Sequence, residues 1–133
     1  MQVLVDTAVW VDHFRHGNDH LVRLLLTGLV VCHPYVILEL ACGTPPDRRE
    51  VLERLGDLQS VPLVTYEELL AFMQRGKVFG RGCGMVEIAL LAAVKMHSQT
   101  RLWTLDKRLN DLAQEFGCAY AAGTDVRSGR RRL

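Results

Sequence analysis

The sequence lacks the features of a membrane protein, a secreted protein and a zinc protein. No apolar run approaches the ~20 residues that a membrane-spanning helix needs. The N-terminus has neither the basic start nor the cleavage site of a signal peptide. The four cysteines are scattered and form no C-x-x-C pair, which argues against a zinc site and a disulfide framework. We therefore expect a cytoplasmic protein whose cysteines are small buried hydrophobes.

The chain also has little net charge, since 16 Lys and Arg stand against 15 Asp and Glu. This balance alone neither indicates nor excludes a nucleic-acid partner. The last residues, 127–132 (RSGRRR), add a local cluster of positive charge. At 133 residues the chain has the length of one domain. We assign that domain to residues 1–124 and a basic, flexible C-terminal tail to residues 125–133, which either touches RNA or a protein partner or is simply disordered.

Short apolar segments alternate with helical patterns along the whole chain. The segments expected to be strands are residues 3–5, 29–32, 61–64, 102–105 and 118–121. The segments expected to be helices are residues 7–15, 19–26, 35–42, a helix after 45–47, one from 66 to about 78, 85–97 and 106–116. This alternation predicts a mainly parallel sheet with helices on both faces. Pro62 confines its segment to the edge of the sheet.

Two aspartates follow predicted strands directly. Asp6 ends the first apolar segment and Asp106 follows residues 102–105. If the chain winds in opposite directions from these two strands, both carboxylates lie at the switch point of the sheet, where α/β proteins bind ligands. Each aspartate alone is more simply explained as the N-cap of the helix that follows.

Two glutamates lie where burial would favour apolar residues. Glu39 is flanked by apolar residues on both sides, and Glu87 lies in the first turn of the most apolar predicted helix. Glu87 alone could favour a helix N-terminus through the macrodipole. Converging carboxylates repel one another unless a cation neutralises them, and oxygen-only ligands suit Mg²⁺ or Mn²⁺. Any one of these residues is best explained as structural, but with Asp6 and Asp106 they favour a metal-dependent catalytic site.

The segments that carry these carboxylates resemble those of PIN-domain ribonucleases of the VapC type, the toxins of toxin–antitoxin pairs. The matching segments are residues 5–12 (VDTAVWVD), 36–41 (VILELA), 82–87 (GCGMVE) and 102–109 (LWTLDKRL). They occur in the order and spacing of the family and extend over most of the chain. One departure is clear, because the family usually has Asp at the third acidic position, where this chain has the longer Glu87.

The resemblance implies a three-layer α/β/α sandwich, the PIN domain, with a central, mainly parallel sheet of four to five strands. It implies an endoribonuclease that leaves 5′-phosphate and 3′-hydroxyl ends, a homodimer, and a VapB-type antitoxin that silences it. The residues that would hold one or two Mg²⁺ or Mn²⁺ ions and carry catalysis are Asp6, Glu39, Glu87 and Asp106. Thr7 and Thr104 would donate hydrogen bonds to these carboxylates.

Other features leave alternatives open. Arg75, Lys77 and Arg81 either contact RNA phosphates or form an ordinary solvated face. The loop 80–84 (GRGCG) lacks the Lys-Ser/Thr ending of a Walker loop and is equally well explained as a flexible lid. The main rival function is a PIN module that binds RNA or a protein partner with little or no cleavage. Chelation of the metal and the Asp6→Asn substitution separate these two functions.

Overall fold

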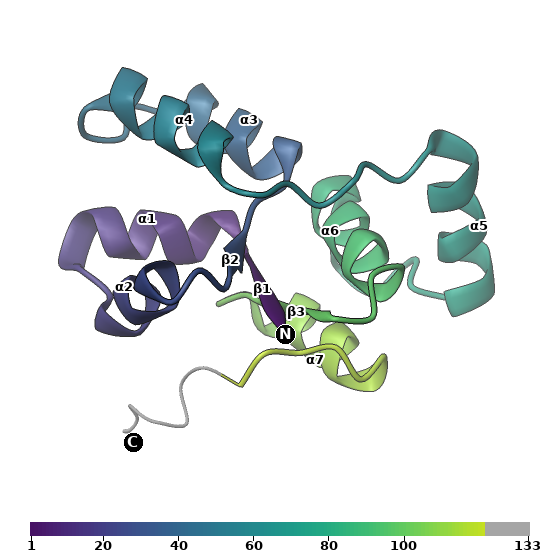
Figure 1. Cartoon of the computed structure of the whole chain (residues 1–133). Coiled ribbons are helices and arrows are strands. Elements are labelled where there is room, and N and C mark those ends of the chain that lie inside the picture. Colours follow the sequence, from purple (N-terminus) through teal and green to yellow (C-terminus); the bar gives the residue numbers. More distant parts are fainter. Residues whose placement is uncertain (122–133) are drawn as a thin grey trace.

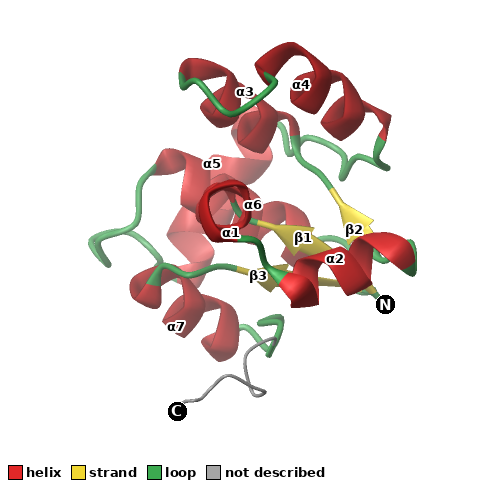
Figure 2. Ribbon diagram, turned by 90° about the vertical axis from the view of Figure 1, so that its left-hand side faces the viewer, coloured by secondary structure: helices red, strands yellow, loops and turns green. Residues whose placement is uncertain are grey.

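The computed structural model describes residues 1–121, so the expected tail at 125–133 and the end of the expected domain lie outside the described residues. The strands are β1 (Gln2–Val5), β2 (Val30–Val31) and β3 (Thr100–Trp103). The helices are α1 (Thr7–His16), α2 (Asp19–Leu26), α3 (Pro34–Cys42), α4 (Arg48–Asp57), α5 (Tyr66–Gly76), α6 (Met85–Lys95) and α7 (Lys107–Glu115). The three strands are parallel in the order β2-β1-β3, which confirms the predicted α/β class (Figure 2).

Helices cover both sides of the sheet, in agreement with the layered arrangement that the alternation predicts. Helices α1 and α2 lie on one side of the strands, and α5 and α6 lie on the other (Figure 1). Helices α6 and α7 both pack against β3, α3 packs against α1 and α4, and α5 forms the outermost layer on α6. Helices therefore cover much of the sheet, although Arg101 within β3 is exposed.

The centre of the core is formed by the central strand β1 and by helix α6, which packs against β3. Val3, Leu4 and Val5 of β1 are completely buried, as a central parallel strand requires. In α6 every residue from Ile88 to Val94 is buried, which confirms the prediction of a helix that is apolar nearly all round. No helix within residues 1–121 is both long enough and apolar enough to cross a membrane.

The prediction of four to five strands is wrong for the described part of the chain, which has three. The expected strands at 61–64 and 118–121 are reduced to single bridges, Cys32 with Ser60 and Leu102 with Ala119. Pro62 has no N–H to donate, so the ladder beside β2 stops after the bond from the Val61 N–H to the Cys32 carbonyl, at 2.8 Å. Beside β3, only the backbone of Leu102 pairs with residues 118–120, through bonds of 2.8 and 2.9 Å.

Candidate active site

Asp6 lies at the carboxyl end of the central strand and is almost buried, with 7% of its surface exposed. Its backbone N–H donates to the carbonyl of Trp103 at 2.9 Å, which joins the end of β1 to the end of β3. As the N-cap of α1, Asp6 accepts a hydrogen bond from the Thr7 N–H on Oδ1 at 2.7 Å. Its other oxygen, Oδ2, accepts from the Thr104 hydroxyl at 2.7 Å. Both oxygens are therefore held by donors from two neighbouring strand ends.

Asp106 follows β3 on the same rim of the sheet. Its backbone N–H donates to Thr104 Oγ1 at 3.0 Å, so one hydroxyl lies between the two aspartates. As the N-cap of α7, Asp106 accepts from the Leu109 N–H on Oδ1 at 3.0 Å. Because β1 and β3 are neighbours in the sheet, the predicted switch point between them is confirmed. Asp6 and Asp106 therefore each cap a helix and also form part of the candidate site.

Glu39 reaches this rim from α3. That helix begins at Pro34, and the buried ring of His33 caps it by accepting the Tyr35 N–H on Nδ1 at 2.9 Å. One turn before the end of α3, the Glu39 Oε1 accepts a hydrogen bond of 2.5 Å from the Thr7 hydroxyl. Thr7 is the neighbour of Asp6 in the chain, so the Glu39 carboxylate is fixed beside Asp6.

Glu87 comes from the first turn of α6 and folds back over the residue that caps this helix. A Cβ placed on Gly84 would lie 2.8 Å from Glu87 Oε1, a distance that real Cβ atoms do not show. The absence of a side chain at Gly84 therefore leaves the space that the carboxylate occupies. The extra methylene of Glu87, relative to an aspartate, is what carries its carboxylate over this glycine.

The acidic side chains influence one another electrostatically. The pKa of Asp6 is raised, mainly because burial penalises its charged form. Hydrogen bonds from Thr104 and from the Thr7 N–H oppose this rise, whereas the negative charges of Glu87 and Asp106 add to it. Asp6, Glu87 and Asp106 therefore share one electrostatic environment, in which a cation would relieve their repulsion.

The donor set fits a hydrated Mg²⁺ or Mn²⁺ better than a fully enclosed ion. All four side chains present carboxylate oxygens, which are the donors these cations prefer. Within residues 1–121 no three His, Cys, Asp or Glu side chains are close enough to form a ready-made cage. Mg²⁺ does not need such a cage, because it keeps several waters and is commonly held by one or two carboxylates together with substrate phosphate.

The basic residues near the site are arranged in a way that sequence reasoning did not anticipate. Arg81 forms a bidentate ion pair with Glu115, with Nη2–Oε2 at 2.5 Å and Nη1–Oε1 at 3.2 Å. Arg75 lies in the last turn of α5 and Lys77 caps its C-terminus, and both are exposed. Arg108, which was not among the candidates, lies across Gly82. Its position two residues after Asp106 was the signal available in the sequence.

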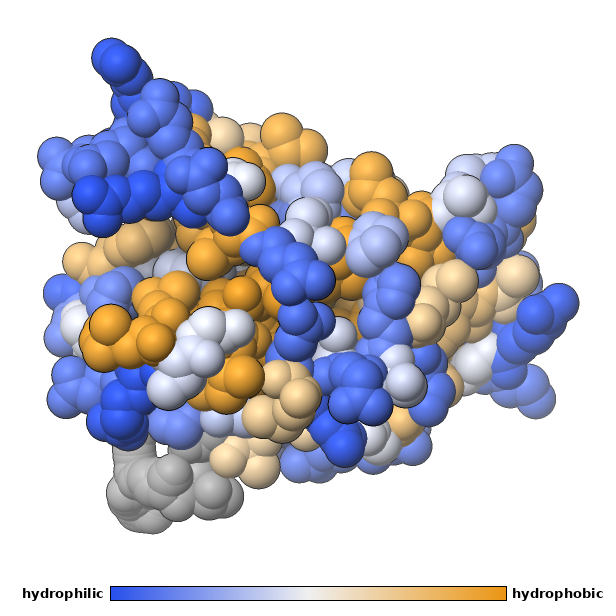
Figure 3. All heavy atoms as spheres, viewed as in Figure 1, coloured by the Kyte–Doolittle hydropathy of each residue, from blue (hydrophilic) through white to orange (hydrophobic). Residues whose placement is uncertain are grey.

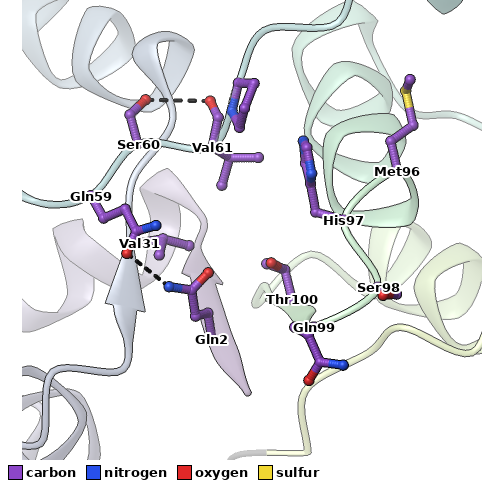
Figure 4. A pocket seen from close by; sticks show the side chains of 11 residues that line it. Gln2, Val31, Gln59, Ser60, Val61, Met96, His97, Ser98, Gln99 and Thr100 are labelled. Carbon is purple, nitrogen blue, oxygen red and sulfur yellow. Dashed lines mark hydrogen bonds between the residues drawn. The ribbon is translucent and has the colours of Figure 1, made fainter.

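A hollow of different character lies at the opposite, amino-terminal edge of the sheet. It has a volume of about 510 Å³ and lies between residues 59–62 and the end of α6 (Figure 4). The Gln2 amide donates to Gln59 across it at 2.9 Å, and His97 is the one ionisable side chain among its lining residues. Without carboxylates or permanent cations, this hollow does not have the chemistry of a phosphodiester-cleaving site.

Two smaller hollows run along α1 towards the carboxylates. One, of about 360 Å³, lies between α1, α2 and α4, where apolar side chains gather on the surface (Figure 3). The other, of about 320 Å³, has Thr7 and Glu39 in its wall. Phe14 lines both, so the two hollows adjoin at this side chain.

Fold and site together define an α/β protein with a carboxylate site at the switch point of a parallel sheet. No family model matches the chain. Its sequence is 44% identical over 119 residues to Ribonuclease VapC32 of Mycobacterium tuberculosis, in strains CDC 1551 / Oshkosh and ATCC 25618 / H37Rv. The match covers 90% of this chain and 96% of the relative. The chain belongs to the VapC family of PIN-domain ribonuclease toxins.

Proposed function

We propose that this protein is the toxin of a type II toxin–antitoxin pair, an endoribonuclease that hydrolyses RNA phosphodiester bonds with the help of Mg²⁺ or Mn²⁺. The observation that carries the proposal is the 44% identity to a named ribonuclease over nearly the whole chain. The placement of Asp6 and Asp106 at the ends of neighbouring strands, joined through the Thr104 hydroxyl, also supports it. As an enzyme acting on RNA, the protein would work in the cytoplasm.

In this proposal the four carboxylates, Asp6, Glu39, Glu87 and Asp106, hold the metal and carry catalysis. When bound there, Mg²⁺ or Mn²⁺ supplies an activated water and positive charge opposite the phosphate. Thr104 keeps one oxygen of Asp6 in a fixed direction, and Thr7 does the same for Glu39. Hydroxyls that orient metal-binding carboxylates in this way limit the reorganisation needed during the reaction.

The alternative is a PIN module that binds RNA or a protein without cutting. It rests on Glu87, which places a carboxylate one methylene further from the backbone than aspartate does. The ribonuclease name of the relative does not favour this alternative.

We also propose two partners besides RNA, a VapB-type antitoxin and a second copy of this chain. The two hollows beside α1 suit an antitoxin segment, because an apolar helix could fill the hollow lined by Trp10, Leu25 and Leu55. An arginine further along that segment would reach the carboxylates near Glu39. Exposed Leu38 on α3 and Leu70 on α5 supply apolar surface for a homodimer, which sedimentation analysis of the purified chain tests.

The test is cleavage of a pool of labelled single-stranded and hairpin RNAs by the purified chain. We expect cleavage with Mn²⁺ or Mg²⁺, 5′-phosphate products, and complete loss of cleavage with EDTA. Asp6→Asn should abolish cleavage while the circular dichroism spectrum and melting temperature stay near those of the wild type, because Asn keeps the shape of the side chain.

The matched control is Asp57→Asn, which removes one negative charge at the exposed end of α4 and should leave cleavage unchanged. Equal cleavage by the wild type and the Asp6→Asn variant would refute the proposal. RNA binding without cleavage by either protein would support the binding module instead.

A further inference from the structure

Arg108 is packed directly against the backbone of the loop that precedes α6. A Cβ on Gly82 would lie 2.7 Å from Arg108 Cδ and 2.9 Å from Nη1. Gly82 also has a φ of +88°, a conformation that side chains disfavour. Glycine is therefore required at position 82 for two reasons, the positive φ of the loop and the close approach of the Arg108 side chain.

This contact places the guanidinium beside the acidic rim. Arg108 follows Asp106 at the start of α7, and the next loop residue, Cys83, lies within electrostatic reach of Arg108, Asp106 and Glu87. Gly84, against which the Glu87 carboxylate folds, is two residues from Gly82 and so within about 7 Å of it. Arg108 and the carboxylates of Asp106 and Glu87 therefore all lie close to this one loop.

Unlike Arg81 and Lys107, Arg108 has no carboxylate partner within residues 1–121. Arg81 is paired with Glu115, and Lys107 is paired with Asp111 at 3.1 Å. No ion pair within 4.0 Å is found for Arg108 among the described residues. Its guanidinium donors remain available at the edge of the site, where a planar fork suits a phosphate group.

We propose that Arg108, supported by the loop around Gly82, is a subsite for an RNA backbone phosphate, next to the phosphate that is cleaved. The inference rests on the proposed ribonuclease function and adds a residue to it. Arg108 is a positioning residue: it sets the register of the strand relative to the carboxylates and does not touch the reacting atoms. Arg108 would fix the RNA on one side of the scissile bond, and the metal ion that the carboxylates would hold would fix it at the bond itself.

The test measures binding and cleavage separately. Binding of a labelled single-stranded RNA is followed by fluorescence anisotropy in the Asp6→Asn background, with and without Arg108→Gln, over a series of salt concentrations. We expect Arg108→Gln to weaken binding roughly tenfold and to reduce the slope of log K against log salt by about 0.7, as loss of one phosphate contact to a single strand requires. In the otherwise wild-type chain, Arg108→Gln should raise KM and change kcat little.

Two further variants distinguish positioning from a general effect of charge. Arg108→Lys keeps the charge and loses the fork, so it should restore the salt slope but only part of the affinity. The Gly82→Ala substitution should displace the Arg108 side chain. The double variant Gly82→Ala/Arg108→Gln should therefore bind RNA as strongly as the single variant Arg108→Gln. The control is Arg49→Gln on α4, whose side chain is 92% exposed and which removes the same charge.

The proposal is overturned if Arg108→Gln binds RNA with the affinity and salt slope of its parent, or loses no more than Arg49→Gln does. It is also overturned if the Asp6→Asn chain binds no RNA. Failure of the ribonuclease function gives a different result: the wild type would not cleave, while Arg108 would still contribute to RNA binding.

Discussion

Thr104 holds Asp6 by a hydrogen bond of 2.7 Å between two residues that are 98 positions apart in the sequence. The same hydroxyl oxygen accepts the Asp106 N–H at 3.0 Å. One small side chain at the end of β3 therefore connects the carboxylate of the central strand with the start of α7. A hydroxyl fulfils both roles because it donates one hydrogen bond and accepts another.

Replacing this hydroxyl by a methyl group tests its importance. Thr104→Val should lower cleavage by roughly 10- to 100-fold, because Asp6 loses the donor that orients it. It should lower the free energy of unfolding by about 2 kcal/mol, the typical value of a buried hydrogen bond to a charged group. Since the Thr104 bond lowers the pKa of Asp6, its loss should move the acidic limb of the pH–rate profile to higher pH.

Thr104→Ser is the matched control, because it keeps the hydroxyl and should retain most of the activity. Rate measurements over pH and urea unfolding of both variants check the prediction. Equal rates for the Val and Ser variants would show that the hydroxyl has no part in the reaction.

The contact between Gly84 and Glu87 permits a compensation experiment. Gly84→Ala should lower cleavage by roughly ten- to a hundredfold, because its Cβ would lie 2.8 Å from Glu87 Oε1 and would displace the carboxylate. The fold should be unaffected, since the φ of −84° at Gly84 is open to alanine.

The shorter side chain of Glu87→Asp leaves room for that methyl group. Gly84→Ala should therefore cost less activity in the Glu87→Asp background than in the wild type. Cleavage rates of the four proteins form a double-mutant cycle. Strictly additive losses would indicate that the two residues do not interact.

His33 should make the protein less stable in acid. Burial lowers the pKa of His33 from 6.5 to about 4, so below pH 6.5 the unfolded chain takes up a proton that the folded chain refuses. The free energy of unfolding should fall as the pH drops from about 6.5 to about 4, by about 3 kcal/mol in total from this residue. Above pH 6.5 its contribution is constant.

His33→Asn removes the titration but keeps a side-chain acceptor that can cap α3. Urea unfolding at pH 7, 5 and 4 should show a weaker pH dependence for this variant than for the wild type. If the free energy of unfolding had the same pH dependence in both proteins, groups other than His33 would be responsible for the acid sensitivity.

Removing the ion pair between Arg81 and Glu115 tests the hypothesis that Arg81 contacts RNA. Removing the carboxylate with Glu115→Gln frees the guanidinium, and the salt dependence of RNA binding should become steeper if Arg81 then binds phosphate. Stability should change little, because both groups are exposed. Anisotropy titrations of the wild type and Glu115→Gln in the Asp6→Asn background measure this, and identical salt slopes would exclude Arg81 as a phosphate contact.

Local patterns allowed much of the fold to be predicted. The apolar segment before Asp6, the cap residues and the apolar pattern of α6 are properties of short stretches, and they predicted the α/β order and the neighbouring strand ends. The number of strands was overestimated because an apolar segment beside a sheet becomes a strand only if its backbone N–H groups can donate hydrogen bonds to the neighbouring strand. Residues 61–64 fail this condition at Pro62.

The candidate carboxylates were found for the same reason, since an acidic residue after a strand or in an apolar segment is visible in the sequence. The basic side of the site was not visible. Sequence reasoning named Arg81 as an RNA contact and did not name Arg108, but the structure pairs Arg81 with Glu115 and lays Arg108 over Gly82.

The sequence by itself therefore determined the order of strands and helices and the residues that bring negative charge to one rim, because periodicity and capping act over a few residues. Only the tertiary structure decided which hydroxyl holds which carboxylate and which arginine keeps its donors available. Those contacts join distant segments, and their geometry depends on how the loop before α6 packs against α7.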